Sequence, residues 1–213
     1  MKNFLFYKIF SLIAFGIITG LSMGSVFGQT AAVLGGKPAF EDLQSPEFSG
    51  GKQKPFKPKD WLEIETKLKI SMGAGSKARV CEKLVVKWYV AVKNPDPSKS
   101  GTLLLLTKDV EHMNVPLEEE IYCSVYLSPV SIKRLTGFDR AGKNAVDYVG
   151  YEVLVNGEKV LQETSKGRPG WWNAASDKIS RSDSVPLLNK NETPFRAMWW
   201  DRYAEVTEGR GTR

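Results

Sequence analysis

One stretch of the chain, residues 81–94 (CEKLVVKWYVAVKN), restricts the fold more than any other. Five apolar side chains share one parity: Leu84, Val86, Trp88, Val90 and Val92. The opposite parity carries three lysines, Lys83, Lys87 and Lys93, together with Val85, Tyr89 and Ala91. Because successive side chains of a β-strand point to opposite faces, this pattern predicts a strand with one face in the core and one in water. We expect the central strand of an antiparallel sheet, with the five apolar residues at the centre of the core.

The rest of the chain shows several further strand patterns separated by turn signals. The predicted strands are residues 61–72, 102–107, 118–127, 146–155, 158–163 and 195–206. Asn156-Gly157 predicts a tight hairpin, because both residues accept the positive φ of a type I′ turn. Ser128-Pro129 and Gly137 mark the start and end of one short helix. The pattern predicts an all-β fold, an immunoglobulin-like two-sheet antiparallel sandwich, with a partly closed barrel as the alternative.

The first 28 residues have the features of an export signal. Lys2 and Lys8 form a basic start, an uncharged run follows, and the small residues Val26 and Gly28 fit a cleavage site. The alternative is an uncleaved anchor, since the uncharged run is long enough to span a bilayer. Export would place the protein in the periplasm, at the outer membrane or on the cell surface.

Composition divides the remainder into three parts. Residues 29–60 are rich in Gly, Pro, Lys and Ser and predict a flexible linker. Residues 61–206 contain the predicted sandwich. Residues 207–213 are a basic tail.

The two cysteines, Cys81 and Cys123, fit the single disulfide of an exported protein. Cys123 shares parity with apolar neighbours, whereas Cys81 shares parity with the lysines. A bridge would therefore need a bulge near Cys81 so that the Cβ vectors converge. The alternative is two free thiols, one buried and one at a strand end.

The chain offers few residues for catalysis or metal binding. His112 is the single histidine, which excludes most nucleophilic triads and zinc sites, and we expect it at the surface. No calcium-loop pattern is present. Without Lys2 and Lys8 the net charge falls from +6 to +4, and the charges form no stripe that would indicate nucleic-acid binding. We therefore expect no enzyme, no metal and no cofactor.

The chain contains two tryptophan pairs, and one of them supplies the candidate contact residues. Trp171 and Trp172 lie in a Gly/Pro loop with Lys166 and Arg168, where aromatic rings beside cations could stack on sugars or anchor a protein partner. The alternative is that they plug the open end of the sandwich. Residues 199–200 lie in a predicted strand, so one indole should face the core and the other the surface.

The stretches FEDLQSPEFSGGKQKPFKPKDWLEIETKLKI, VVKWYVAVKN and FRAMWWDRYAEV resemble a family of secreted proteins from the type IV pilus-like gene cluster of Akkermansia (Verrucomicrobia). The resemblance implies an immunoglobulin-like sandwich, a place at the cell surface or outer membrane, and no catalytic residues. A polymerising pilin keeps a long apolar N-terminal helix that often carries a glutamate, whereas residues 1–28 contain no acidic residue. An accessory or surface-displayed role fits better.

Two functions follow from these observations. The first is a non-enzymatic structural or interaction module of the envelope, whose partners are envelope or pilus-locus proteins or further copies bound through edge strands. The alternative is a mucin-type glycan-binding sandwich that uses Trp171 and Trp172.

Overall fold

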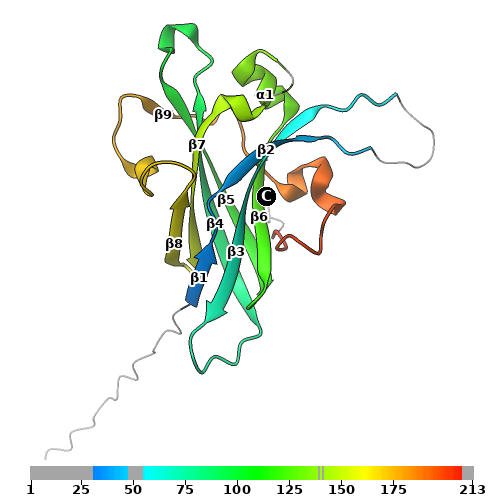
Figure 1. The fold of residues 1–213 in the computed structure, drawn as a ribbon, viewed down its shortest axis with the longest axis vertical. Coiled ribbons are helices and arrows are strands. Elements are labelled where there is room, and N and C mark those ends of the chain that lie inside the picture. The colour runs from blue at the N-terminus through cyan, green and yellow to red at the C-terminus, as the bar shows by residue number, and fades with distance from the viewer. Residues whose placement is uncertain (1–30, 48–54, 139, 141, 208–213) are drawn as a thin grey trace, which may run out of the picture.

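The computed structural model describes residues 31–47, 55–138, 140 and 142–207. These residues form two β-sheets packed face to face, with one short α-helix at one end of the sandwich (Figure 1). The predicted all-β two-sheet sandwich is confirmed. No helix in these ranges is both long and apolar enough to cross a membrane.

The first sheet has the order β1-β3-β6-β10, with β2 also paired to β3, and every pairing is antiparallel. Its strands are β1 (Ala31–Gly35), β2 (Ala39–Gln44), β3 (Asp60–Met72), β6 (Glu120–Leu127) and β10 (Leu188–Asn189).

The second sheet has the order β8-β7-β4-β5-β9, antiparallel except for the parallel pair β5–β9. Its strands are β4 (Val80–Lys93), β5 (Leu103–Pro116), β7 (Val146–Val155), β8 (Glu158–Thr164) and β9 (Ile179–Arg181). The helices are α1 (Pro129–Thr136) and the short 3-10 turns η1 (Pro97–Lys99), η2 (Gly142–Ala145), η3 (Trp171–Asn173), η4 (Lys190–Glu192) and η5 (Pro194–Ala197).

Strand β4 is the centre of the second sheet, as its alternation predicts. Its five predicted core residues are fully buried: Leu84, Val86, Trp88, Val90 and Val92. Trp88 packs against Tyr151 of the neighbouring strand β7, with ring centroids 5.6 Å apart. Burial of one large apolar side chain stabilises the folded state by about 2 kcal/mol relative to leaving it exposed. The core-facing side of β4, with five such side chains, therefore contributes strongly to the stability of the fold. On the outer face, Lys83 and Lys87 pair with acidic residues of β5, Glu111 and Asp109.

The alternation of β4 breaks at its start. Cys81 is buried although it shares parity with the lysines, and the next two residues, Glu82 and Lys83, are both exposed. Across the ladder in β5, Asn114 has a left-handed φ of 54°, and it lies between the partners of Lys83 and Cys81. This local irregularity turns Cys81 from the outer face into the core.

The disulfide between Cys81 and Cys123 is not formed. Both cysteines are free thiols buried in the same hydrophobic core, one from each sheet. The strand irregularity near Cys81 that a disulfide would require is present, but its effect is to bury the Cys81 thiol among apolar side chains. Burial raises the pKa of both thiols, which disfavours the thiolate needed for oxidation.

The short-range signals for the helix and the hairpin are confirmed. The Ser128 hydroxyl accepts a hydrogen bond from the Ser131 N–H at 3.2 Å, and Gly137 ends the helix with a φ of 80°. Asn156 and Gly157 have φ values of 51° and 88° and join β7 to β8. In each case a local backbone requirement fixed the residue type.

The prediction of a flexible linker over residues 29–60 is wrong within the described part of that segment. Strands β1 and β2 both pair with the same edge of β3. Between the two strands, the Gly36 N–H donates to the Lys67 carbonyl of β3 at 2.9 Å. An edge strand held by main-chain hydrogen bonds buries few side chains, so it leaves little hydrophobic pattern in the sequence. The folded domain therefore includes residues from 31 onward; the predicted signal, residues 1–28, lies outside the described residues.

The predicted strand over residues 195–206 is also wrong. The segment forms η5 and then an irregular path joined to the sheets by isolated bridges. Phe195 is buried, whereas Trp200 is exposed, and the residues of this segment show no strand-like alternation. The short 3-10 turn begins at Pro194, which supplies the fixed φ for its first position.

Candidate functional site

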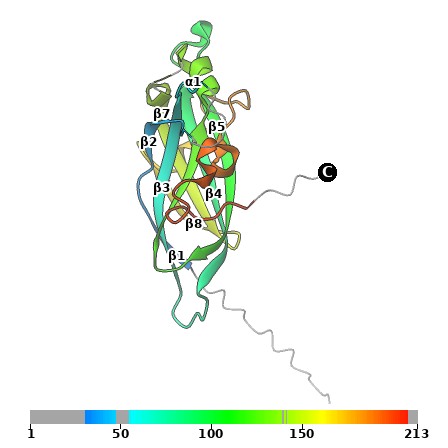
Figure 2. The ribbon, with the colours of Figure 1, turned by 90° about the vertical axis from the view of Figure 1, so that its right-hand side faces the viewer.

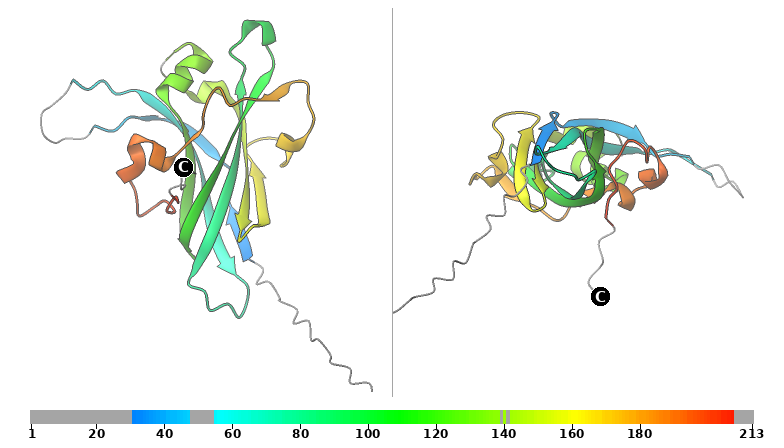
Figure 3. Two further views of the ribbon diagram at one scale, coloured as in Figure 1. Left: turned by 180° about the vertical axis from the view of Figure 1, so that it is seen from behind. Right: turned by 90° about the horizontal axis from the view of Figure 1, so that it is seen from below.

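A C-terminal strap, residues 190–207, crosses one side of the sandwich. It begins after β10, lies over the outer face of the first sheet, and continues to the edge of β5. Figure 2 looks onto this orange-red segment, and in Figures 1 and 3 it lies on the opposite side of the molecule from β8. The strap thus covers the side where β6 and β5 would otherwise present unpaired edges.

Main-chain hydrogen bonds join the strap to both sheets. The Tyr122 N–H of β6 donates to the Arg202 carbonyl at 3.1 Å, and the Ala204 N–H donates to the Tyr122 carbonyl at 3.1 Å. The Thr207 N–H then donates to the Glu111 carbonyl of β5 at 2.8 Å. The strap is therefore fixed at both sheet edges.

A network of side-chain hydrogen bonds and one ion pair also holds the strap against the outer face of the first sheet. The Tyr203 hydroxyl lies 2.9 Å from Glu63 Oε1 and 2.9 Å from Glu65 Oε2, so its single proton serves one carboxylate at a time. The Tyr126 hydroxyl donates to Glu63 at 2.7 Å, and Arg202 forms an ion pair with Glu65 at 3.0 Å. Burial, followed by the nearby carboxylates, raises the pKa of both tyrosines, so both remain neutral hydrogen-bond donors.

Cations also pack against the aromatic rings of this network. The Arg202 guanidinium lies 3.7 Å from the centre of the Tyr122 ring, and Lys190 Nζ lies 4.7 Å from that of Tyr203. Lys190 also donates to the Met198 carbonyl, and burial lowers the pKa of its ammonium group.

On this support the strap presents two exposed indoles. Trp200 is 79% exposed and Trp199 is 41% exposed. Trp199 has a left-handed φ of 50°, and its ring lies parallel to that of buried Phe195 with centroids 6.3 Å apart. A hollow of about 260 Å³ lies beside Trp200 and is lined partly by Tyr203 and Val206. The prediction that one member of this pair faces the core is wrong.

The predicted contact residues of the other loop are placed differently. Trp172 is 5% exposed and stacks on Tyr89 of β4, with centroids 4.6 Å apart and planes 6° from parallel. Trp171 is half-buried, lies edge-on to Tyr148 at 4.3 Å, and donates from Nε1 to Thr164 at 3.0 Å. The pair covers the outer face of the second sheet, so it neither plugs an open end nor offers a free stacking surface.

The two cations predicted beside that pair remain at the surface. Lys166 forms an ion pair with Asp147 at 3.2 Å and lies 5.8 Å from the Tyr148 ring centre. Arg168 is exposed in the same loop. The structure therefore brings Lys166 close to aromatic rings, but not as part of an open tryptophan platform.

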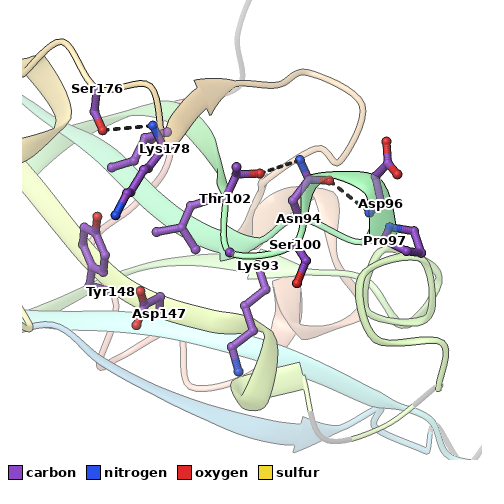
Figure 4. A pocket seen from close by; sticks show the side chains of 13 residues that line it. Lys93, Asn94, Asp96, Pro97, Ser100, Thr102, Asp147, Tyr148, Ser176 and Lys178 are labelled. Atoms are coloured by element: carbon purple, nitrogen blue, oxygen red, sulfur yellow. Dashed lines mark hydrogen bonds between the residues drawn. The ribbon is translucent and has the colours of Figure 1, made fainter.

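A second hollow, of about 640 Å³, lies where β4 connects to β5 (Figure 4). Lys93 and Thr102 flank the connection, Tyr148 comes from β7, and Lys178 comes from the segment before β9. Sequence reasoning missed this hollow, because it joins three segments that are distant in the chain and share no motif.

His112 is buried, not exposed as expected. Its side chain is on the core-facing parity of β5 with Val110, and Nδ1 lies 3.2 Å from the Ala204 carbonyl oxygen of the strap. Burial lowers its pKa from 6.5 to about 4, so the imidazole is neutral at physiological pH. Among the described residues, no group of three or more His, Cys, Asp and Glu side chains is arranged to hold a metal ion.

Comparison with known proteins supports the similarity to a protein family found in Akkermansia. A protein-family model matches residues 24–210. No curated protein matches. A crystal structure of a protein from Akkermansia muciniphila matches with a TM-score of 0.77 and 38% sequence identity, over 84% of this chain and 94% of that chain. The chain therefore belongs to the same protein family as this Akkermansia muciniphila protein.

Proposed function

We propose that the protein is a non-enzymatic structural or interaction module of the cell envelope or surface, associated with a type IV pilus-like assembly, and that the strap is its contact surface. The observation that carries the proposal is Trp200, an indole 79% exposed on a rigidly held segment. A large aromatic side chain that is free in the monomer and buried by a partner is the usual anchor of a protein interface.

The strap is prepared for such a role before any partner arrives. Main-chain bonds fix it to β5 and β6, and the network of Tyr203, Glu63 and Glu65 fixes it from below. Because the strap is already ordered, it loses little conformational entropy when a partner covers Trp200, and this favours a high affinity for that partner. The left-handed backbone of Trp199 costs on the order of 1 kcal/mol for a residue that is not glycine, and such conformations cluster at contact sites.

Envelope location and pilus association are supported by the resemblance to the pilus-like cluster proteins and by the export pattern of residues 1–28. Membership of the same family as the Akkermansia muciniphila protein is consistent with both.

Site-specific crosslinking in native envelopes tests the proposal. A photoreactive phenylalanine analogue replaces Trp200, and the matched control carries it at Val130, which is 75% exposed on α1. We expect adducts with proteins of the pilus-like locus from position 200 and none from position 130. Identical adducts from both positions, or no adduct from position 200, would contradict the proposal.

A substitution pair provides the second measurement. Trp200→Ala and Val130→Ala both truncate exposed apolar side chains, so neither should change the free energy of unfolding by more than about 0.5 kcal/mol. In an affinity pull-down from envelope extracts, Trp200→Ala should lower recovery of the partner identified by crosslinking at least about tenfold, as expected for an interface anchor, whereas Val130→Ala should leave recovery unchanged.

A further inference from the structure

The hollow between the β4–β5 connection and the segment before β9 has a preformed frame. The Leu103 N–H donates to the Lys178 carbonyl at 2.7 Å, and the Asn94 N–H donates to the Thr102 carbonyl at 3.1 Å. The Asn94 side-chain amide also donates to the Thr102 hydroxyl at 3.1 Å, one of the dashed contacts in Figure 4. Its volume of about 640 Å³ falls in the range of small-molecule sites, which are largely formed before binding.

The charges in the hollow leave a surplus of cations. The Asp147 carboxylate is paired with Lys166 at 3.2 Å. The Asp96 carboxylate accepts from the Ser98 N–H and hydroxyl at 2.9 and 2.7 Å, and in Figure 4 it points away from the other labelled side chains. Within the described ranges, Lys93 donates to a neutral acceptor, the Asn144 carbonyl, at 2.9 Å and forms no ion pair.

Lys178 is the second cation, and its ammonium group has no partner among the described residues. In Figure 4 its side chain extends toward the side of the hollow where Tyr148 and Asp147 lie. The Tyr148 hydroxyl likewise makes no hydrogen bond within the described chain. Burial and the nearby Asp147 raise its pKa, so it stays a neutral donor.

The remaining lining is suited to a ring that bears hydroxyl groups. Leu103 and Ile179 are half-buried and supply apolar surface, while Ser100 and Ser176 supply hydroxyls. A sugar ring has an apolar C–H face and a polar rim, and aromatic and aliphatic side chains pack against that face. The lining contains no arginine, so it lacks the planar fork that binds a phosphate group through two parallel hydrogen bonds.

We propose that this hollow binds an acidic carbohydrate, with the carboxylate facing Lys178 and the ring packed beside Tyr148. The ligand class follows from one cation without a partner among the described residues, neutral donors and half-buried apolar side chains in one preformed hollow. The site lies apart from Trp200, so it does not depend on the proposed contact surface.

Titration followed by NMR or calorimetry tests the ligand class with three probes: glucuronic acid, glucose and acetate. Glucuronic acid should bind at least about tenfold more tightly than either of the others, a difference of about 1.4 kcal/mol. Because charged contacts are screened, its affinity should fall as salt rises. Equal affinity for glucose would overturn the role of Lys178, and equal affinity for acetate would overturn the role of the sugar ring.

A matched pair of variants tests the site. Lys178→Gln removes the cation in the hollow, and Lys99→Gln removes one from η1 of the same connection, outside the lining. We expect Lys178→Gln to weaken glucuronic acid binding about tenfold, while Lys99→Gln leaves it unchanged. Equal effects of the two variants would overturn the proposal. Trp200→Ala should bind glucuronic acid as the wild type does, so this test and that of the contact surface can fail separately.

Discussion

At position 150 of β7 the second sheet has no room for a side chain. A Cβ there would lie 2.2 Å from Cζ3 of Trp172, whose ring is stacked on Tyr89. The indole therefore cannot retreat without losing that stacking. Sequence alternation predicted the strand but not this role of Gly150, because the loop that supplies Trp172 is distant in the chain.

The substitution Gly150→Ala should lower the free energy of unfolding by about 1–3 kcal/mol, the usual cost of overpacking. Urea unfolding measures it, with Gly36→Ala as the control, where the nearest atom to the new Cβ is the Lys67 carbonyl oxygen at 3.7 Å. In a Trp172→Ala background the same change at position 150 should cost little. An equal cost in both backgrounds would show that the contact with Trp172 is not the cause.

Among the elements, the sequence predicted those whose pattern is local. The parity of β4, the Asn156-Gly157 turn and the Ser128 cap each depend on neighbouring residues alone. Strands β1 and β2 were not predicted, because an edge strand held by main-chain hydrogen bonds requires few apolar side chains. The strap was mistaken for a strand because its aromatic spacing resembles alternation, although its path is set by bonds to β5 and β6.

His112 lies where the strap meets β5, and its burial makes that junction sensitive to acid. The folded-state pKa of about 4 lies below the ordinary value of 6.5. Above pH 6.5 the imidazole is neutral in both the folded and the unfolded protein, and the free energy of unfolding is not reduced by this residue. As pH falls from 6.5 to 4, the imidazole gains a proton only in the unfolded protein, so the free energy of unfolding falls. The loss should reach about 3 kcal/mol.

Urea unfolding of the wild type and His112→Gln across this pH window measures the effect. Carboxylates titrate in both proteins, so the difference between the two curves isolates the histidine. The variant should lose less stability between pH 6.5 and pH 4. Parallel curves would contradict the assignment.

For the whole molecule, the core was predictable and the surfaces were not. Burial of the five apolar residues of β4 follows from their own parity. The exposure of Trp200 and the burial of Trp172 depend on where two long irregular segments cross the sheets. The path of an irregular segment cannot be predicted from a periodic pattern in its sequence. The hollow beside Lys178 likewise depends on long-range pairing, since the parallel pairing of β9 with β5 places the segment that carries Lys178.

The stability of the molecule should be independent of redox conditions. A bridge between Cys81 and Cys123 would have contributed about 4 kcal/mol by loop closure, but both thiols are free and buried, one in each sheet. A reducing agent should therefore leave the melting temperature unchanged. A thiol reagent should react slowly with the native protein and titrate both thiols after unfolding in urea, because burial hinders access and raises the thiol pKa. Absence of titratable thiols in the unfolded, unreduced protein, or a fall in melting temperature on reduction, would show instead that the two sheets are covalently joined.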